Sequence, residues 1–207
     1  KLGNVVSNHF SPSAFEFIDG VFVPDGGNGE IELPVSSTGI MVTGLPKTSG
    51  NAWDMIRNGP VASQHSTELG GIDFTTDGHS LLGLHANAGI TFDLKAMRRV
   101  LLAIDELGVS EHAQAEKHTG AALRLTANVG YFGAVGDHCA DVWFFLDGRK
   151  VVEFQKLRRE DGLQFVDIEL PATARFLTLI STDGGDGYAM DQIGFRSEEH
   201  TSELQSR

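Results

Sequence analysis

A chain of 207 residues is long enough to bury a sizeable core and suits one domain, or one domain with a small extension. Its formal net charge is −12, and an acidic surface of that size repels phosphate groups, so nucleic acid and anionic membrane surfaces are not expected as partners. The single cysteine, Cys139, excludes an internal disulfide framework, and no apolar run approaches the roughly 20 residues that cross a bilayer.

Short apolar runs separated by 25 glycines are typical of an all-β domain with many turns. Three strands are expected in the N-terminal part, over 15–23, 30–35 and 39–45. The polar and irregular stretch 46–70, which contains Trp53, is interpreted as a long ordered loop.

Alternating apolar and polar residues predict the clearest strand at 88–94, where Ile90 and Phe92 share one face and Thr91 lies on the other. Further strands are expected over 123–129, 141–147, 150–155, 164–170, 176–182 and 192–195. The segment 176–182 is apolar on both faces at its centre, as a central strand would be. The pair Asp147-Gly148 predicts a type I′ hairpin turn.

One segment departs from the strand pattern. Apolar residues recur at helical spacing from Leu94 to Ile104, Asp93 is suited to cap the start, and Gly108 is suited to end the helix. A helix is therefore expected over 95–106. Many short strands with one helix favour an all-β fold, an antiparallel β-sandwich of the jelly-roll type.

Motifs of common catalytic sites are not found in the sequence, which has no G-x-S-x-G elbow, no H-E-x-x-H zinc motif and no phosphate-binding loop. His112, His118 and His138 would form a zinc site only if the fold brought them together, and the alternative is that they are solvent-exposed loop residues. A carbohydrate-active hydrolase stays open as an alternative, because any acidic chain can supply two carboxylates at the required separation.

The segment 183–191 holds the richest polar cluster, with Asp183, Asp186 and Asp191 among glycines. Three carboxylates in a glycine-rich loop suit a calcium ion. The alternative is structural, with these residues forming turns and accepting hydrogen bonds from neighbouring backbone N–H groups. The same loop, which includes Tyr188, is also suited to hydrogen-bond sugar hydroxyls.

Two further features are candidates for ligand contact. His85 and Asn87 precede the strand 88–94 and are suited to bind a hydroxylated ligand, while the alternative for His85 is a buried residue at a corner of the sandwich. Trp143 and Phe145 share one face of the expected strand 141–147. Either both faces of that strand are buried, or Trp143 is an aromatic platform for a sugar ring, a role for which Trp53 is a comparable candidate.

Three stretches, in this order, resemble the novel putative carbohydrate-binding module. They are LLGLHANAGITFDL (81–94), VWFFLDGRKVVE (142–153) and FLTLISTDGGDGYAMDQIGF (176–195), and the resemblance covers roughly 68–195. It implies a galactose-binding-like β-sandwich without catalysis, which binds a glycan or polysaccharide as part of a larger multidomain chain outside the cell, in the periplasm or at the cell surface. The residues expected to contact the ligand are His85, Asn87, Trp143, Asp183, Asp186, Tyr188 and Asp191.

The remaining parts of the chain carry their own expectations. Residues 1–67 are expected to form N-terminal strands and a long loop packed on the sandwich 68–195. Within them, 13–60 resemble the lead-in of large planctomycete-type surface or regulatory proteins, which implies as an alternative a protein-interaction or structural sandwich at the outer end of an anti-sigma-type membrane regulator. The chain starts with Lys1 rather than Met, so we interpret it as part of a longer protein. The tail 196–207 resembles the translation of a sequencing adapter and is expected to be non-native.

Overall fold

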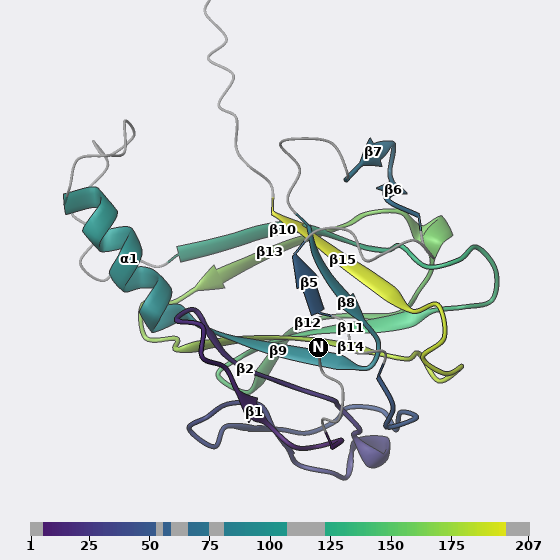
Figure 1. Ribbon diagram of the computed structural model, residues 1–207, viewed down its shortest axis with the longest axis horizontal. Helices are drawn as coiled ribbons and strands as arrows, with labels where there is room; N and C mark the ends of the chain where they lie inside the picture. Colours follow the sequence, from purple (N-terminus) through teal and green to yellow (C-terminus); the bar gives the residue numbers. More distant parts are fainter. Residues whose placement is uncertain (1–5, 53–55, 59–65, 75–80, 107–122, 198–207) are drawn as a thin grey trace, which may run out of the picture.

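The computed structural model describes residues 6–52, 56–58, 66–74, 81–106 and 123–197. Its two main sheets, one of six strands and one of five, are antiparallel and pack face to face, which confirms the predicted β-sandwich (Figure 1). No helix among these residues is long and apolar enough to span a membrane.

The six-stranded sheet has the strand order β1-β2-β9-β14-β11-β12. The strands, in that order, are β1 (Ser11–Pro12), β2 (Ile18–Phe22), β9 (Ala88–Asp93), β14 (Phe176–Thr182), β11 (Ala140–Leu146) and β12 (Arg149–Leu157). All of β14 is buried, as predicted for a central strand. Between β11 and β12, Asp147 and Gly148 have φ angles of 48° and 81°, which are the positive values that a type I′ turn requires.

The five-stranded sheet has the order β13-β10-β15-β8-β5. The strands, in that order, are β13 (Gln164–Leu170), β10 (Leu123–Tyr131), β15 (Gln192–Ser197), β8 (Leu82–His85) and β5 (Ile56–Asn58). Two small hairpins pair β3 (Leu33–Pro34) with β4 (Met41–Val42) and β6 (Glu68–Leu69) with β7 (Ile72–Asp73).

The structure bears on two expected segment boundaries, those of the loop 46–70 and of the tail 196–207. The interpretation of 46–70 as a loop is wrong for β5 and β6, because β5 pairs with β8 along one edge of the sheet. Arg196 and Ser197, the first residues of the expected tail, continue β15 opposite Asn128 and Ala127. The rest of that tail lies outside the described residues, so its origin stays a prediction.

Strand β11 is buried on both faces, which resolves the two interpretations of Trp143. Val142 and Phe144 face the main core between the two sheets. Trp143 and Phe145 face the other way and pack with Phe22 and further apolar residues of the N-terminal part. This part covers the outer face of the six-stranded sheet as an additional layer (Figure 1).

The same N-terminal layer changes the environment of β9. Ile90 lies in the intersheet core, as its place in the alternating pattern predicts. Thr91, expected on a polar face, is fully buried, and its hydroxyl donates a hydrogen bond to the carbonyl oxygen of Val35 at 2.6 Å. The alternating pattern therefore assigned Ile90 and Thr91 to the correct opposite faces of β9. It did not predict that the face with Thr91 is buried as well.

The helix α1 (Leu94–Glu106) confirms the helix predicted over 95–106. Asp93 caps it, since its Oδ1 accepts a hydrogen bond from the backbone N–H of Ala96 at 2.9 Å. We expect Asp93→Ala to lower the free energy of unfolding by about 1 kcal/mol in urea denaturation. Asp93→Asn, which keeps the capping oxygen, should lose less, and equal losses for both variants would contradict the capping role.

Candidate functional site

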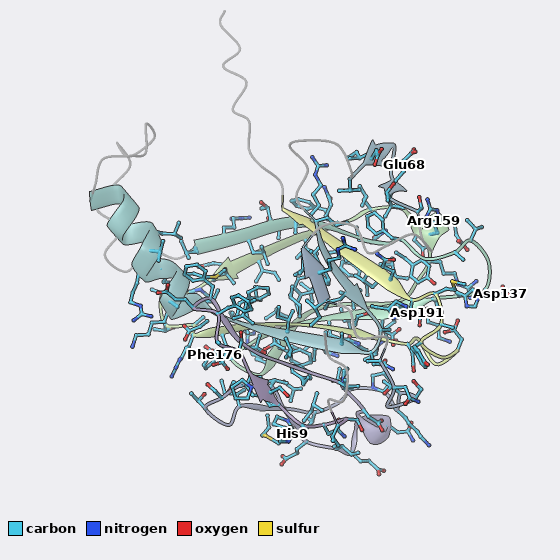
Figure 2. All side chains as sticks on the ribbon, in the orientation of Figure 1. His9, Glu68, Asp137, Arg159, Phe176 and Asp191 are labelled. Carbon is cyan, nitrogen blue, oxygen red and sulfur yellow. The ribbon has the colours of Figure 1, made fainter. Side chains whose placement is uncertain are left out.

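Loops from distant parts of the sequence meet at one end of the sandwich. The turn between β8 and β9 supplies His85 and Asn87, and the β14–β15 loop supplies Asp183, Asp186, Tyr188 and Asp191. The two loops are joined by a backbone hydrogen bond of 2.9 Å from the N–H of Ala86 to the carbonyl oxygen of Asp191. Figure 2 labels Asp191 at this end of the molecule. We name this set of residues the loop-end cluster.

Asp183 and Asn87 form the buried base of the loop-end cluster, with exposed fractions of 2 % and 0 %. The Asp183 carboxylate accepts hydrogen bonds from the backbone N–H groups of Ser49 (2.9 Å) and Gly185 (3.3 Å). It also lies 3.1 Å from Nδ2 of Asn87, which in turn donates to the carbonyl oxygen of Asn51 at 3.0 Å. These two side chains therefore hold the 49–51 segment against the glycine-rich turn of the β14–β15 loop.

Asp191 is a buried carboxyl group paired with a buried phenol. The Tyr131 hydroxyl lies 3.0 Å from the carbonyl oxygen of Met190 and 3.2 Å from Oδ1 of Asp191, but it has only one hydrogen to donate. Burial, with a further contribution from the nearby charge of Asp186, raises the pKa of Asp191 to about 9. A protonated Asp191 can donate to the Tyr131 oxygen while Tyr131 donates to Met190, which leaves only Oδ2 of Asp191 without a donor among the described residues.

Tyr188 and Asp186 form the accessible rim of the loop-end cluster. Tyr188 is half-buried, and its ring stands edge-on to the ring of buried His85, with centroids 6.4 Å apart and an interplanar angle of 70°. Asp186 is exposed, and its Oδ2 accepts a hydrogen bond from the backbone N–H of Cys139 at 3.2 Å. Burial and the Asp186 charge raise the pKa of the Cys139 thiol to about 11, so this cysteine is held as a neutral thiol.

The calcium ion expected at Asp183, Asp186 and Asp191 stays a prediction that the arrangement of these side chains does not support. In the part of the chain that the structure describes, no three His, Cys, Asp or Glu side chains lie together in a way that could hold a metal ion. The Asp183 oxygens accept hydrogen bonds from the backbone N–H groups of Ser49 and Gly185, and Asp191 is paired with the Tyr131 hydroxyl. The same finding leaves His138 and Cys139 without a zinc site, whereas His112 and His118 lie outside the described residues.

The interpretation of Trp143 as an exposed aromatic platform on which a sugar ring stacks is wrong. Its side chain is only 3 % exposed, and its Nε1 donates a hydrogen bond to Oγ1 of Thr182 at 2.9 Å. Because the N-terminal layer covers this face of β11, a sugar ring cannot stack on it. Trp53, the comparable candidate, lies outside the described residues.

Burial also divides the remaining expected contact residues. His85, Asn87, Asp183 and Asp191 are each 3 % exposed or less, so they support the loops from below, whereas Asp186 and Tyr188 are open to solvent. Ser49, Asn51 and Tyr131 belong to the same cluster and were not expected from the sequence. No local signal could have found Ser49, whose contact with Asp183 spans 134 positions of the chain.

Several solved structures that resemble this chain contain carbohydrate-binding modules. One is CBM51 from Clostridium perfringens GH95 in complex with methyl-galactose, with 16 % identity, a TM-score of 0.45, and coverage of 70 % of this chain and 90 % of that one. Another is CBM51-2 in complex with GlcNAc, with INT domains, from Clostridium perfringens ZmpB, with 11 % identity, a TM-score of 0.43, and coverage of 92 % and 40 %. A third is the tandem CBM51 modules of Sp3GH98 from Streptococcus pneumoniae, with 15 % identity, a TM-score of 0.37, and coverage of 58 % and 32 %.

This chain thus spans most of the first of these structures and less than half of the other two. No model of a known protein family matches the chain. No curated protein sequence matches it either.

Proposed function

We propose that this chain is a non-catalytic carbohydrate-binding module of a larger extracellular or cell-surface protein, and that the loop-end cluster contacts the glycan. The observation that carries the proposal is the convergence of a half-exposed aromatic ring, Tyr188, with an exposed carboxylate, Asp186, on a base of buried polar side chains. Saccharides combine apolar ring faces with many hydroxyl groups. An aromatic ring beside hydrogen-bond acceptors matches both features.

Two buried oxygens in the same cluster support a hydroxyl-rich ligand. Oδ1 of Asn87 and Oδ2 of Asp191 have no hydrogen-bond donor among the described residues. Buried acceptors are costly to leave unsatisfied, and because both side chains are closed to solvent, a water that bridges them to a ligand hydroxyl would supply the donor. The segments that supply these oxygens, 81–94 and 176–195, are also two of the three that resemble the novel putative carbohydrate-binding module.

The charge of the cluster favours a neutral or amino sugar over an anionic one. Asp186, Asp183 and Asp141 all lie close enough to raise the pKa of Asp191. Their combined negative potential repels sulfate and uronate groups in the same way as it disfavours ionisation of Asp191. We therefore expect sulfated and uronic-acid glycans to bind more weakly than neutral glycans of similar size.

Glycan-array binding of the 207-residue chain tests the proposal, with Tyr188→Ala and Asp186→Asn as site variants. We expect binding to a neutral glycan, a loss of affinity of about tenfold or more in Tyr188→Ala, and no change on adding a chelator. Phe15→Ala is the matched control, because Phe15 is an aromatic residue that is 76 % exposed and lies near β2, outside the cluster. A folded chain that binds no glycan, or equal losses in Tyr188→Ala and Phe15→Ala, would contradict the proposal and favour the interaction-module alternative.

A further inference from the structure

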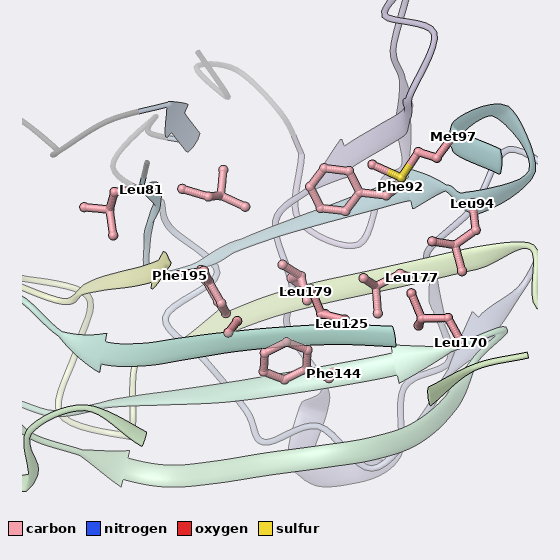
Figure 3. Close-up of a pocket in the computed structure, with 12 residues that line it drawn as sticks. Leu81, Phe92, Leu94, Met97, Leu125, Phe144, Leu170, Leu177, Leu179 and Phe195 are labelled. Atoms are coloured by element: carbon pink, nitrogen blue, oxygen red, sulfur yellow. The ribbon is translucent and has the colours of Figure 1, made fainter. Parts of the chain in front are cut away.

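A cavity of about 300 Å³ lies between the two sheets, and it is separate from the loop-end cluster (Figure 3). Its walls come from β9, β11 and β14 of one sheet, from β8, β10, β13 and β15 of the other, and from the start of α1. The lining side chains among the described residues are all apolar, and in Figure 3 most of those labelled gather between the two sheets. The cavity therefore extends between the two sheets and is open to solvent on one side.

This volume is unusual for a close-packed core. Protein interiors contain few voids larger than a water molecule. An apolar cavity of about 150 Å³ already stays dry and binds benzene, so twice that volume suits an apolar group of roughly twelve carbon atoms. Water is poorly held here because the walls are mostly apolar and supply few hydrogen-bond partners.

The cavity reaches the surface at the start of α1. Phe92 and Met97, which line it there, are only partly buried, as are Leu82 and Leu125 of the facing sheet, whereas Phe144 and Leu179 are nearly fully buried (Figure 3). An apolar ligand that entered beside α1 would extend between the sheets.

Two basic side chains lie on the first turns of α1, beside the capping residue Asp93, although the whole chain carries −12. Lys95 is exposed on the first turn of α1. Arg98 donates hydrogen bonds to the carbonyl oxygens of Leu170 (3.3 Å), Pro171 (2.7 Å) and Ala174 (2.5 Å), and Leu170 lines the cavity. The Nε of Arg98 is buried without an acceptor among the described residues.

From the apolar walls and this charge we infer that the cavity binds the hydrocarbon chain of a fatty acid, with the carboxylate beside Lys95 and Arg98. A linear chain of about twelve carbons matches the volume. Its anionic head finds the cationic side chains at the opening. This inference does not rest on glycan binding, because the cavity and the loop-end cluster share no residue.

Titration with dodecanoate below its micelle concentration, followed by displacement of an anilinonaphthalene sulfonate probe, tests the inference. We expect saturable binding to the 207-residue chain. Ala127→Leu fills the cavity from β10 and should weaken dodecanoate binding about fiftyfold, since each excluded methylene costs roughly fourfold in affinity. Leu179→Phe, which fills it from β14, should act in the same direction and guards against a folding defect in either variant.

A neutral analogue of dodecanoate distinguishes the contribution of the head group to binding from that of the hydrocarbon chain. Lys95→Glu should weaken dodecanoate binding roughly threefold and leave dodecan-1-ol binding unchanged, because only the carboxylate interacts with that charge. An absence of binding by either compound to the wild-type chain would overturn the inference. So would unchanged affinity in folded Ala127→Leu and Leu179→Phe, while equal effects of Lys95→Glu on both compounds would contradict the placement of the head group.

Discussion

Replacing Trp143 with alanine is expected to lower the free energy of unfolding by about 3–5 kcal/mol, because the indole is a core side chain. It is 3 % exposed and packs with Phe145, Phe22 and Ile180 beneath the N-terminal layer. Its removal would leave a cavity between this layer and the six-stranded sheet. Urea denaturation followed by circular dichroism measures the change.

Trp143→Phe separates packing from hydrogen bonding at this position. It keeps an aromatic ring but loses the N–H that donates to Oγ1 of Thr182, so we expect a smaller loss of about 1–2 kcal/mol. A platform residue would give the opposite pattern, with unchanged stability and lost ligand binding in Trp143→Ala. That outcome would contradict the packing described here.

The stability of this protein is expected to decline as the pH rises from about 4 to about 9, and Asp191→Asn should remove much of the decline. Burial, followed by the charge of Asp186, raises the pKa of Asp191 to about 9 in the folded chain, whereas an unfolded chain releases this proton near pH 3.9. Between these values the folded state holds the extra proton. Asp191 therefore lowers the free energy of unfolding by up to about 1.4 kcal/mol for each pH unit gained.

Thermal unfolding of wild type and Asp191→Asn at about pH 5, 7 and 9 measures this difference directly. The variant should gain melting temperature relative to wild type as the pH rises. Asp167→Asn is the matched control, because Arg124 holds the pKa of this exposed carboxyl below its usual range, so its small contribution is lost only as the pH falls. A difference between wild type and Asp191→Asn that does not change with pH would show that Asp191 is ionised in the folded protein.

Local pattern was sufficient for the strands whose two faces differ or whose centre is wholly apolar. The alternation in β13 and the continuous apolar run in β14 both match the structure because the intersheet core imposes them. Strand β5 has only three residues, Ile56 to Asn58, and forms because β8 offers it a free edge. Such a strand carries no periodicity that the sequence could reveal.

Several residues of the candidate site could be predicted from the sequence, but their burial and their contacts with one another could not. His85, Asn87 and the aspartates of 183–191 stood out because they adjoin strand ends and glycines. Their burial depends on packing against segments such as 49–51, which lie far away in the sequence. The sequence therefore indicated two of the loops at the site, whereas the contribution of 49–51 and the division between buried support and exposed rim required the fold.

The most direct test of glycan binding at the loop-end cluster is a backbone amide NMR titration of the 207-residue chain with a glycan selected on the array. Binding at this cluster predicts concentration-dependent shifts at Asn51, Asp186 and Tyr188, with smaller shifts at the buried residues beneath them. Shifts confined to other surfaces, such as the one around exposed Phe165 on β13, would contradict this placement of the glycan.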